Sequence, residues 1–129
     1  MGKKIIASNK LPVVGPYSIA VEANGLIFLS GQIPINPVTS EIIHDIKIAT
    51  RQVLNNIQTI IFAAGLTMAD IIKTTIFLKD IADFPVVNEI YAEFFPEEPP
   101  ARSTIAVSNL PKGVPIEIEA IAVRNKSQV

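Results

Sequence analysis

The segment Ile116–Val123 (IEIEAIAV) constrains the fold more than any other part of the chain, because its side chains alternate in character. Successive side chains of a β-strand point to opposite faces of the sheet. One face would carry small or branched apolar residues that suit packing against helices: Ile116, Ile118, Ala120 and Ala122. The other would carry two carboxylates beside two aliphatic side chains: Glu117, Glu119, Ile121 and Val123. A solvated face rarely keeps such aliphatic residues, so we expect a subunit interface or a cleft there.

A second strand pattern also predicts apolar surface that needs to be covered by another subunit. The stretch SIAVEANGLIFLSG predicts two strands joined at Asn24-Gly25, a dipeptide typical of tight hairpins. The second arm, Leu26–Leu29, is apolar at every position, which indicates a strand buried on both faces. Hydrophobic residues make up 49% of only 129 positions. Because a chain this short has little interior, we expect some of this apolar surface to be buried between subunits.

Two helices are predicted from apolar residues at helical spacing. The first runs over Ile46–Ala64, with Asp45 as its N-cap and Gly65 just beyond its C-terminus. The second runs over Asp83–Phe94, with Asp83 as the cap and a proline tolerated in the first turn.

The remaining strands are expected at Lys3–Ala7, Ile71–Lys79 and Ser103–Ser108. Together these elements predict an α+β fold in a single domain over residues 1–129. A single mixed β-sheet of about six strands would have two helices packed on one face.

Composition excludes several classes of function. The chain has no cysteine, so disulfides, thiolate metal sites and a thiol nucleophile are excluded. Its one histidine, His44, lies near a helix start, where a surface or capping role is typical. We therefore expect no metal and no cofactor. The net charge is −1, without the basic stripe of a nucleic-acid binder.

The N-terminal residues lack a signal-peptide pattern, and no apolar run approaches the roughly 18 residues of a membrane span. These features predict a soluble, cytoplasmic protein without a membrane partner.

In the segment EEPPARST, Arg102 comes two residues after a pair of conformationally restricted prolines. Pro99 and Pro100 fix their own φ angles and favour extended conformations in the residues before them. Two interpretations stay open from this segment alone. Either the prolines brace Arg102 for binding, or they simply end a helix before a strand.

Five segments together resemble the RidA family, also called YjgF, of enamine/imine deaminases: GPYS, SGQIP, VVNEIYAEFF, PPARST and IEIEAIA. The resemblance covers nearly the whole chain. It implies a homotrimer with a central β-barrel and active sites in the clefts between subunits. It also implies 2-iminobutanoate/2-iminopropanoate deaminase activity, in which reactive 2-imino and enamine acids such as 2-aminoacrylate are hydrolysed to 2-oxo acids and ammonia. Such a reaction protects pyridoxal-phosphate enzymes from damage.

The resemblance assigns catalytic roles to three residues. Arg102 matches the arginine that grips the substrate carboxylate, and a planar guanidinium suits two parallel hydrogen bonds. Glu117 matches the glutamate that positions or activates water, although an interface ion pair is the other interpretation and Glu119 competes for the role. Tyr17 matches a tyrosine lining the pocket; the alternative is a core tyrosine.

Three further residues are expected to bind substrate. Gly31 would let the backbone approach the ligand closely, or is a simple turn glycine. Asn88 matches a helix position near the site, although a surface asparagine is equally consistent. Thr104 stands where many family members have cysteine, and imine hydrolysis needs no thiol.

Two other functions remain open. A non-catalytic sensor of small carboxylates would use Arg102 in the same way, although Glu117 beside an acidic ligand favours catalysis. A ribonuclease or translation-inhibitor role, attributed to some family members, is disfavoured by the near-neutral charge.

Overall fold

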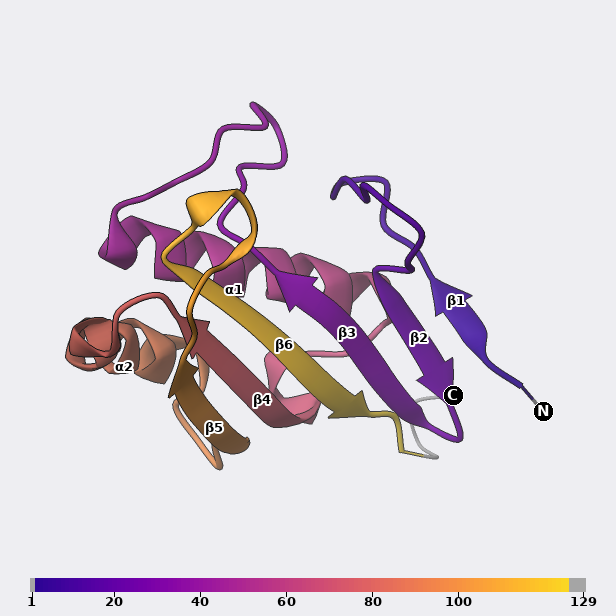
Figure 1. Cartoon of the computed structure of the whole chain (residues 1–129). Helices are drawn as coiled ribbons and strands as arrows, with labels where there is room; N and C mark the ends of the chain where they lie inside the picture. Colours follow the sequence, from indigo (N-terminus) through magenta and orange to yellow (C-terminus); the bar gives the residue numbers. More distant parts are fainter. Residues whose placement is uncertain (1, 126–129) are drawn as a thin grey trace.

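A single mixed sheet and two helices form the fold in the computed structural model, which describes residues 2–125 (Figure 1). The strands and helices follow in this order: β1 (Lys4–Ile6), β2 (Ala20–Ala23), β3 (Leu26–Gln32), α1 (Ile46–Ala63), β4 (Ile71–Leu78), α2 (Phe84–Phe94), β5 (Ala101–Ala106) and β6 (Ile116–Val123). Both helices lie behind the sheet in Figure 1. The predicted α+β class, with about six strands and two helices, is confirmed.

The last strand lies inside the sheet. The spatial order is β1-β2-β3-β6-β4-β5, so β6 separates β3 from β4. Only β4 and β5 pair in parallel, connected by α2, and every other neighbouring pair is antiparallel. The sheet is therefore mixed, and β5 forms one edge of it.

The hairpin between β2 and β3 has the geometry that its sequence predicts. Asn24 has a φ of 51° and Gly25 a φ of 80°, and Ala23 pairs with Leu26 across the turn. Positive φ at both central residues is the type I′ turn that Asn-Gly favours.

Helix α1 ends at Ala63, one residue before the predicted Ala64, and Gly65 lies just beyond the C-cap as predicted. Gly65, with a φ of 78°, donates its N–H to the carbonyl of Phe62 at 2.9 Å, and Leu66 donates to Ile61 at 3.0 Å. These two bonds form a Schellman motif. At the other end, Asp45 occupies the N-cap position, but its side chain makes no capping hydrogen bond. No helix within residues 2–125 is both long and apolar enough to cross a membrane.

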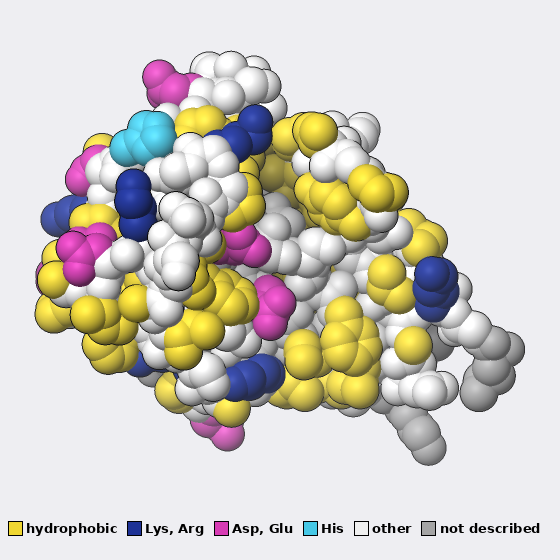
Figure 2. All heavy atoms as spheres, in the orientation of Figure 1, with side chains coloured by type: hydrophobic (Ala, Val, Ile, Leu, Met, Phe, Trp, Pro, Cys, Tyr) yellow, Lys and Arg dark blue, Asp and Glu magenta, His cyan; other side chains and the backbone are white. Residues whose placement is uncertain are grey.

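The two faces of β6 differ as the alternation predicts. The four small or branched residues are buried beneath the helices: Ile116, Ile118, Ala120 and Ala122. On the other face Glu117 is half-buried and Glu119 is exposed. Phe28 of the neighbouring strand β3 is 44% exposed there. Figure 2 shows this open face, where hydrophobic side chains gather over the strands and acidic side chains lie near the middle.

The boundaries of β5 were predicted wrongly. The strand spans Ala101–Ala106 rather than Ser103–Ser108, because pairing with β4 begins at Lys73 opposite Ala101. Pro100 leads the chain directly into the extended conformation that this pairing requires. Arg102 is therefore the second residue of an edge strand, and it does not precede the strand. The strands β1 and β4 also end one residue earlier than expected.

The start of α2 differs in detail. Asp83 occupies the N-cap position, but its backbone is already helical and its side chain caps nothing. A 3₁₀ turn over Ile81–Asp83 precedes the helix, and Asp80 accepts a hydrogen bond from the N–H of Ala82 at 2.9 Å. The predicted proline in the first turn, Pro85, is present.

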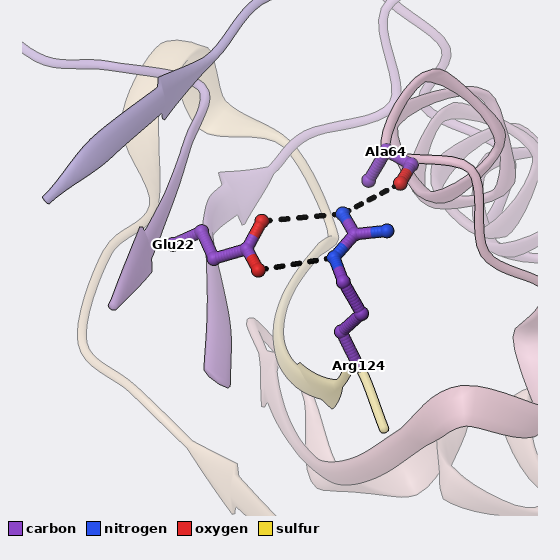
Figure 3. Close-up of polar contacts among 3 residues, drawn as sticks. All are labelled: Glu22, Ala64 and Arg124. Carbon is purple, nitrogen blue, oxygen red and sulfur yellow. Dashed lines mark hydrogen bonds and ion pairs between the residues drawn. The ribbon is translucent and has the colours of Figure 1, made fainter. Parts of the chain in front are cut away.

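An ion pair that the sequence analysis did not predict joins three elements (Figure 3). Arg124, just after β6, donates from Nε and Nη2 to the two carboxylate oxygens of Glu22 on β2, at 3.0 and 3.2 Å. Nη2 also donates to the carbonyl of Ala64, at the C-terminal end of α1, at 2.7 Å. The hydrogen bond from Arg124 lowers the pKa of Glu22 below its usual value.

We expect Arg124→Met to lower the free energy of unfolding by about 1–3 kcal/mol at neutral pH, because Glu22 and the Ala64 carbonyl lose a charged donor. The pKa of Glu22 is lowered by folding, so this contribution is present above the ordinary glutamate pKa and is lost as the pH falls through the lowered value.

Urea unfolding at one fixed protein concentration measures the effect. The matched control is Arg51→Met, which breaks the exposed pair with Glu93 and should cost less than about 1 kcal/mol. Equal losses in the two variants would contradict the role given to Arg124.

Candidate active site

Gly31 lies against Glu117 at an irregularity in β3. The pairing register between β3 and β6 shifts between Leu29 and Gln32. Ser30 fixes this segment, since its N–H donates to the carbonyl of Ile19 at 2.9 Å. A Cβ atom added at Gly31 would lie 2.9 Å from Cδ of Glu117, so only glycine fits without displacing the carboxylate. Gly31 is therefore a strand residue and not a turn glycine. Within the chain, its backbone lies close to the side chain of Glu117.

Three of the expected site residues line one cavity of about 480 Å³: Tyr17, Gly31 and Glu117. The hydroxyl-bearing Tyr17 is 50% exposed, so it is not a core tyrosine. Lys112 adds a positive charge to the lining, and most of the remaining wall is apolar. The cavity thus combines one carboxylate, one phenol and one ammonium group with an apolar surface.

The carboxylate in this cavity is a weaker acid than an ordinary glutamate. Burial raises the pKa of Glu117, and the negative charge of Glu119 raises it further. No cation forms an ion pair with Glu117 within residues 2–125. A carboxylate with a raised pKa can both accept and donate a proton nearer neutral pH.

Arg102 lies in a different cavity, of about 470 Å³, together with Asn88 and the two prolines Pro99 and Pro100. Its guanidinium lies over two aromatic rings of α2, with Cζ 4.9 Å from the centroid of Tyr91 and 5.3 Å from that of Phe84.

Two buried polar atoms near Arg102 have no partner in the part of the chain that the structure describes. They are Oδ1 of Asn88 and Oγ1 of Thr104. Thr104 follows Arg102 by two residues on β5, so both side chains point to the same face of the strand. Buried polar groups are nearly always hydrogen-bonded in proteins, so these two atoms are available to a water molecule, a ligand or another copy of the chain.

The two cavities lie on opposite sides of the sheet. Arg102 pairs with Thr74, whose buried hydroxyl is hydrogen-bonded to that of Tyr91 on α2 at 2.7 Å, so Arg102 faces the helix side. Glu117 lies between Ile116 and Ile118, which are buried under the helices, so it faces the open side. The chain therefore brings Tyr17, Gly31 and Glu117 together, and Asn88 and Arg102 together, but does not unite the two groups.

Sequence reasoning missed Asn56 of α1, which supports the wall of the first cavity. This buried amide donates to the carbonyl of Ile35 at 2.9 Å and of Ile33 at 3.4 Å, both in the segment that lines the cavity. The signal was a polar residue on the apolar stripe of a helix, three after Val53 and four before Ile60.

Lys112 and the aromatic rings beneath Arg102 were also missed, because no local pattern predicts their distant neighbours. No group of three or more His, Cys, Asp or Glu residues within residues 2–125 is placed to hold a metal ion.

We expect Gly31→Ala to reduce activity more than stability. The new methyl group would meet the flexible end of Glu117, which can rotate away at small energetic cost but then leaves its position. Displacing a catalytic group by about 1 Å can cost on the order of 10²-fold in rate, while the melting temperature should change little. Activity and thermal unfolding, measured in parallel with Gly2→Ala as the control in open space, test this. An unchanged rate would contradict the close approach.

The sequence of this chain is similar to those of known proteins over nearly its whole length. A RutC family protein of Pyrococcus horikoshii is 52% identical over 125 residues, which cover 96% of this chain and 99% of that protein. The 2-iminobutanoate/2-iminopropanoate deaminase of Escherichia coli K12 is 49% identical over 127 residues, covering 96% of this chain and 99% of that protein.

Solved structures and a family model agree with these relatives. The crystal structure of Escherichia coli TdcF with bound serine superposes with a TM-score of 0.90 at 45% identity, covering 95% of this chain and 99% of that one. A family model described as Endoribonuclease L-PSP matches residues 7–124. The chain belongs to this family, which is also known as the YjgF/RidA family.

Proposed function

We propose that this protein is a hydrolytic deaminase that converts 2-imino and enamine acids to 2-oxo acids and ammonia, in sites completed by neighbouring copies of the chain. The observation that carries the proposal is the placement of a guanidinium that is unpaired within residues 2–125, that of Arg102, and a carboxylate of raised pKa, that of Glu117, on opposite sides of one sheet. The deaminases among its relatives, at 46–49% identity, support the same reaction.

Arg102 is suited to hold the substrate carboxylate. Among residues 2–125 no carboxylate pairs with it, whereas Arg51 and Arg124 each bind a glutamate. A free guanidinium offers two parallel N–H donors to a bound carboxylate. The relative crystallised with serine carries an amino acid, whose carboxylate is of the kind that this arginine would bind.

Asn88 and Thr104 lie beside Arg102 with unpaired buried oxygens. In the proposed complex, the Asn88 oxygen accepts a hydrogen bond from the substrate nitrogen. The Thr104 hydroxyl is free to donate to the substrate carboxylate or to accept from its nitrogen.

Glu117 is proposed as the general base. It removes a proton from water, the water oxygen bonds to C2 of the imine, and the C=N electron pair passes to the nitrogen, which takes up a proton. The resulting carbinolamine loses ammonia after a second proton reaches the nitrogen, while its hydroxyl proton is released. One water is consumed, and the raised pKa lets Glu117 return the proton that it accepted.

A homotrimer with a central β-barrel would unite the two groups. The open sheet face carries the exposed Phe28 as well as the half-buried Glu117, and this face would line the barrel. In a cyclic trimer each cleft can combine Arg102 of one subunit with Glu117, Tyr17 and Gly31 of the next. Light scattering should give three times the chain mass, and a stable monomer at micromolar concentration would remove the proposed site.

The proposed physiological substrates include 2-aminoacrylate, an intermediate released by pyridoxal-phosphate enzymes and harmful to them. The proposal places the protein in the cytoplasm, because such short-lived compounds must be intercepted where they form. The small polar and apolar cavity around Tyr17 suits a substrate of this class.

The test is to generate 2-aminoacrylate with a dehydratase and to follow pyruvate formation with and without the protein. Faster release of pyruvate and ammonia supports the proposal. Binding of 2-oxo acids without acceleration would instead support a sensor. Cleavage of RNA by the purified protein, unaffected by Arg102→Lys, would favour the endoribonuclease activity named in the family description.

A further inference from the structure

Arg102 is held in a different way from the other two arginines of the chain. Arg51 and Arg124 each donate two hydrogen bonds to a glutamate: Arg51 to Glu93, and Arg124 to Glu22. In the described part of the chain, Arg102 instead lies over the rings of Tyr91 and Phe84. Its neighbourhood is therefore aromatic, and its charge is not neutralised by an acidic residue.

Tyr91 is itself fixed in place. Its side chain is 5% exposed, its hydroxyl lies 2.7 Å from that of Thr74, and its ring centroid lies 4.6 Å from that of Phe95. These contacts hold the ring to both the sheet and the helix. A fixed ring face beneath a guanidinium restricts the positions that the cation can occupy.

Aromatic rings and carboxylates position an arginine with different consequences. A carboxylate occupies the N–H donors at the edge of the guanidinium, so an incoming anion has to displace it. A ring attracts the cation through its face and leaves the edge donors free. For a residue that must bind an anion, the second arrangement retains both the charge and the hydrogen-bonding capacity.

We propose that Tyr91 and Phe84 are positioning residues that hold the Arg102 guanidinium in its substrate-binding pose while leaving it unpaired. This inference rests on the proposed function, because it assumes that Arg102 binds the substrate carboxylate. The rings touch Arg102 and need not touch the substrate. Their contribution is to ground-state binding of the carboxylate.

Three variants separate the ring from the hydroxyl. Tyr91→Leu removes the ring, Tyr91→Phe keeps the ring but removes the hydroxyl, and Phe84→Leu removes the second, only partly buried ring. Ile90→Val is the control for a small loss of packing in α2, because Ile90 is buried and makes no ring contact with Arg102. Phe84→Leu keeps the test available if Tyr91→Leu does not fold.

The measurements are kcat and KM for imine hydrolysis and, by calorimetry, the Kd of 2-oxobutanoate, the 2-oxo acid corresponding to 2-iminobutanoate. Loss of one ring should raise KM and Kd by about 3- to 30-fold, the scale of a cation–π contact, with kcat within about threefold of wild type. Ile90→Val should stay close to wild type. Tyr91→Phe should lose less affinity than Tyr91→Leu, because it keeps the ring under Arg102 and loses only the hydroxyl contact with Thr74.

Folded Tyr91→Leu and Phe84→Leu proteins with wild-type KM and Kd would overturn the inference alone. So would an equal loss of affinity in Tyr91→Phe and Tyr91→Leu, because the hydroxyl would then be the important group. A wild-type protein that neither hydrolyses imines nor binds 2-oxobutanoate would contradict the proposed function, and this inference with it.

Discussion

Replacing Glu117 by glutamine should slow imine hydrolysis by roughly 10²-fold or more, the usual scale for loss of a general base. Glutamine keeps the shape of the side chain but cannot accept the proton from water. Binding of a 2-oxo acid should hold or tighten slightly, because the acidic ligand no longer faces a second carboxylate. Single-turnover hydrolysis and 2-oxobutanoate calorimetry measure the two effects, and a wild-type rate would exclude Glu117 as the base.

We expect such a loss of activity to occur without unfolding. Burial and the charge of Glu119 raise the pKa of Glu117 in the folded protein. The contribution of this group to stability is therefore greatest below the ordinary glutamate pKa and falls as the pH rises through the raised value. At neutral pH we expect Glu117→Gln to be as stable as wild type or slightly more stable.

The same shift predicts the pH dependence of the reaction. The acid limb of kcat/KM should lie above the pH expected for an ordinary glutamate, because Glu117 must be ionised to act as a base. Glu119→Gln removes the negative charge that contributes to the raised pKa, so it should move this limb to lower pH with little change in the plateau rate. Equal plateau losses in Glu117→Gln and Glu119→Gln would show that the two carboxylates act together.

Arg102→Lys should lower kcat/KM by about 10- to 10²-fold, mainly through KM, while the fold is retained. Lysine keeps the positive charge but cannot form two parallel hydrogen bonds with a carboxylate, and hydrogen bonds to charged groups contribute about 1.5–3 kcal/mol each. It also loses the flat face that lies over Tyr91 and Phe84. Steady-state kinetics and the Kd of 2-oxobutanoate measure the loss. Hydrolysis as fast as wild type would contradict the proposal that Arg102 binds the substrate carboxylate.

Local sequence patterns predicted most helices, strands and turns, because these features depend on residues that are neighbours in the sequence. The Asn24-Gly25 turn, the Gly65 helix end and the two faces of Ile116–Val123 follow from backbone preferences and side-chain period alone. The start of β5 at Ala101 was missed because it depends on pairing with the distant strand β4.

The contacts within the site were less predictable for the same reason. Gly31 stood out in the sequence, but its approach to Glu117 depends on the pairing of β3 with β6. The placement of Arg102 and Glu117 on opposite faces of the sheet depends on their register with β4, where Arg102 pairs with Thr74 and Glu117 pairs with Phe77. Strand register of this kind is set by long-range pairing, which a local pattern does not encode.

The central claim, that each site needs two copies of the chain, is tested most directly with mixed assemblies of two impaired variants, assayed at a substrate concentration well below the wild-type KM. Arg102→Lys and Glu117→Gln subunits, co-expressed with different tags and purified together, would leave one cleft with both native residues in every mixed trimer. Trimers selected through both tags should therefore have one native site in three, and an unselected random 1:1 mixture should have about a quarter of the wild-type sites. Activity well above that of either variant alone is the predicted result, and mixed trimers no more active than the separate variants would show that the site does not lie between subunits.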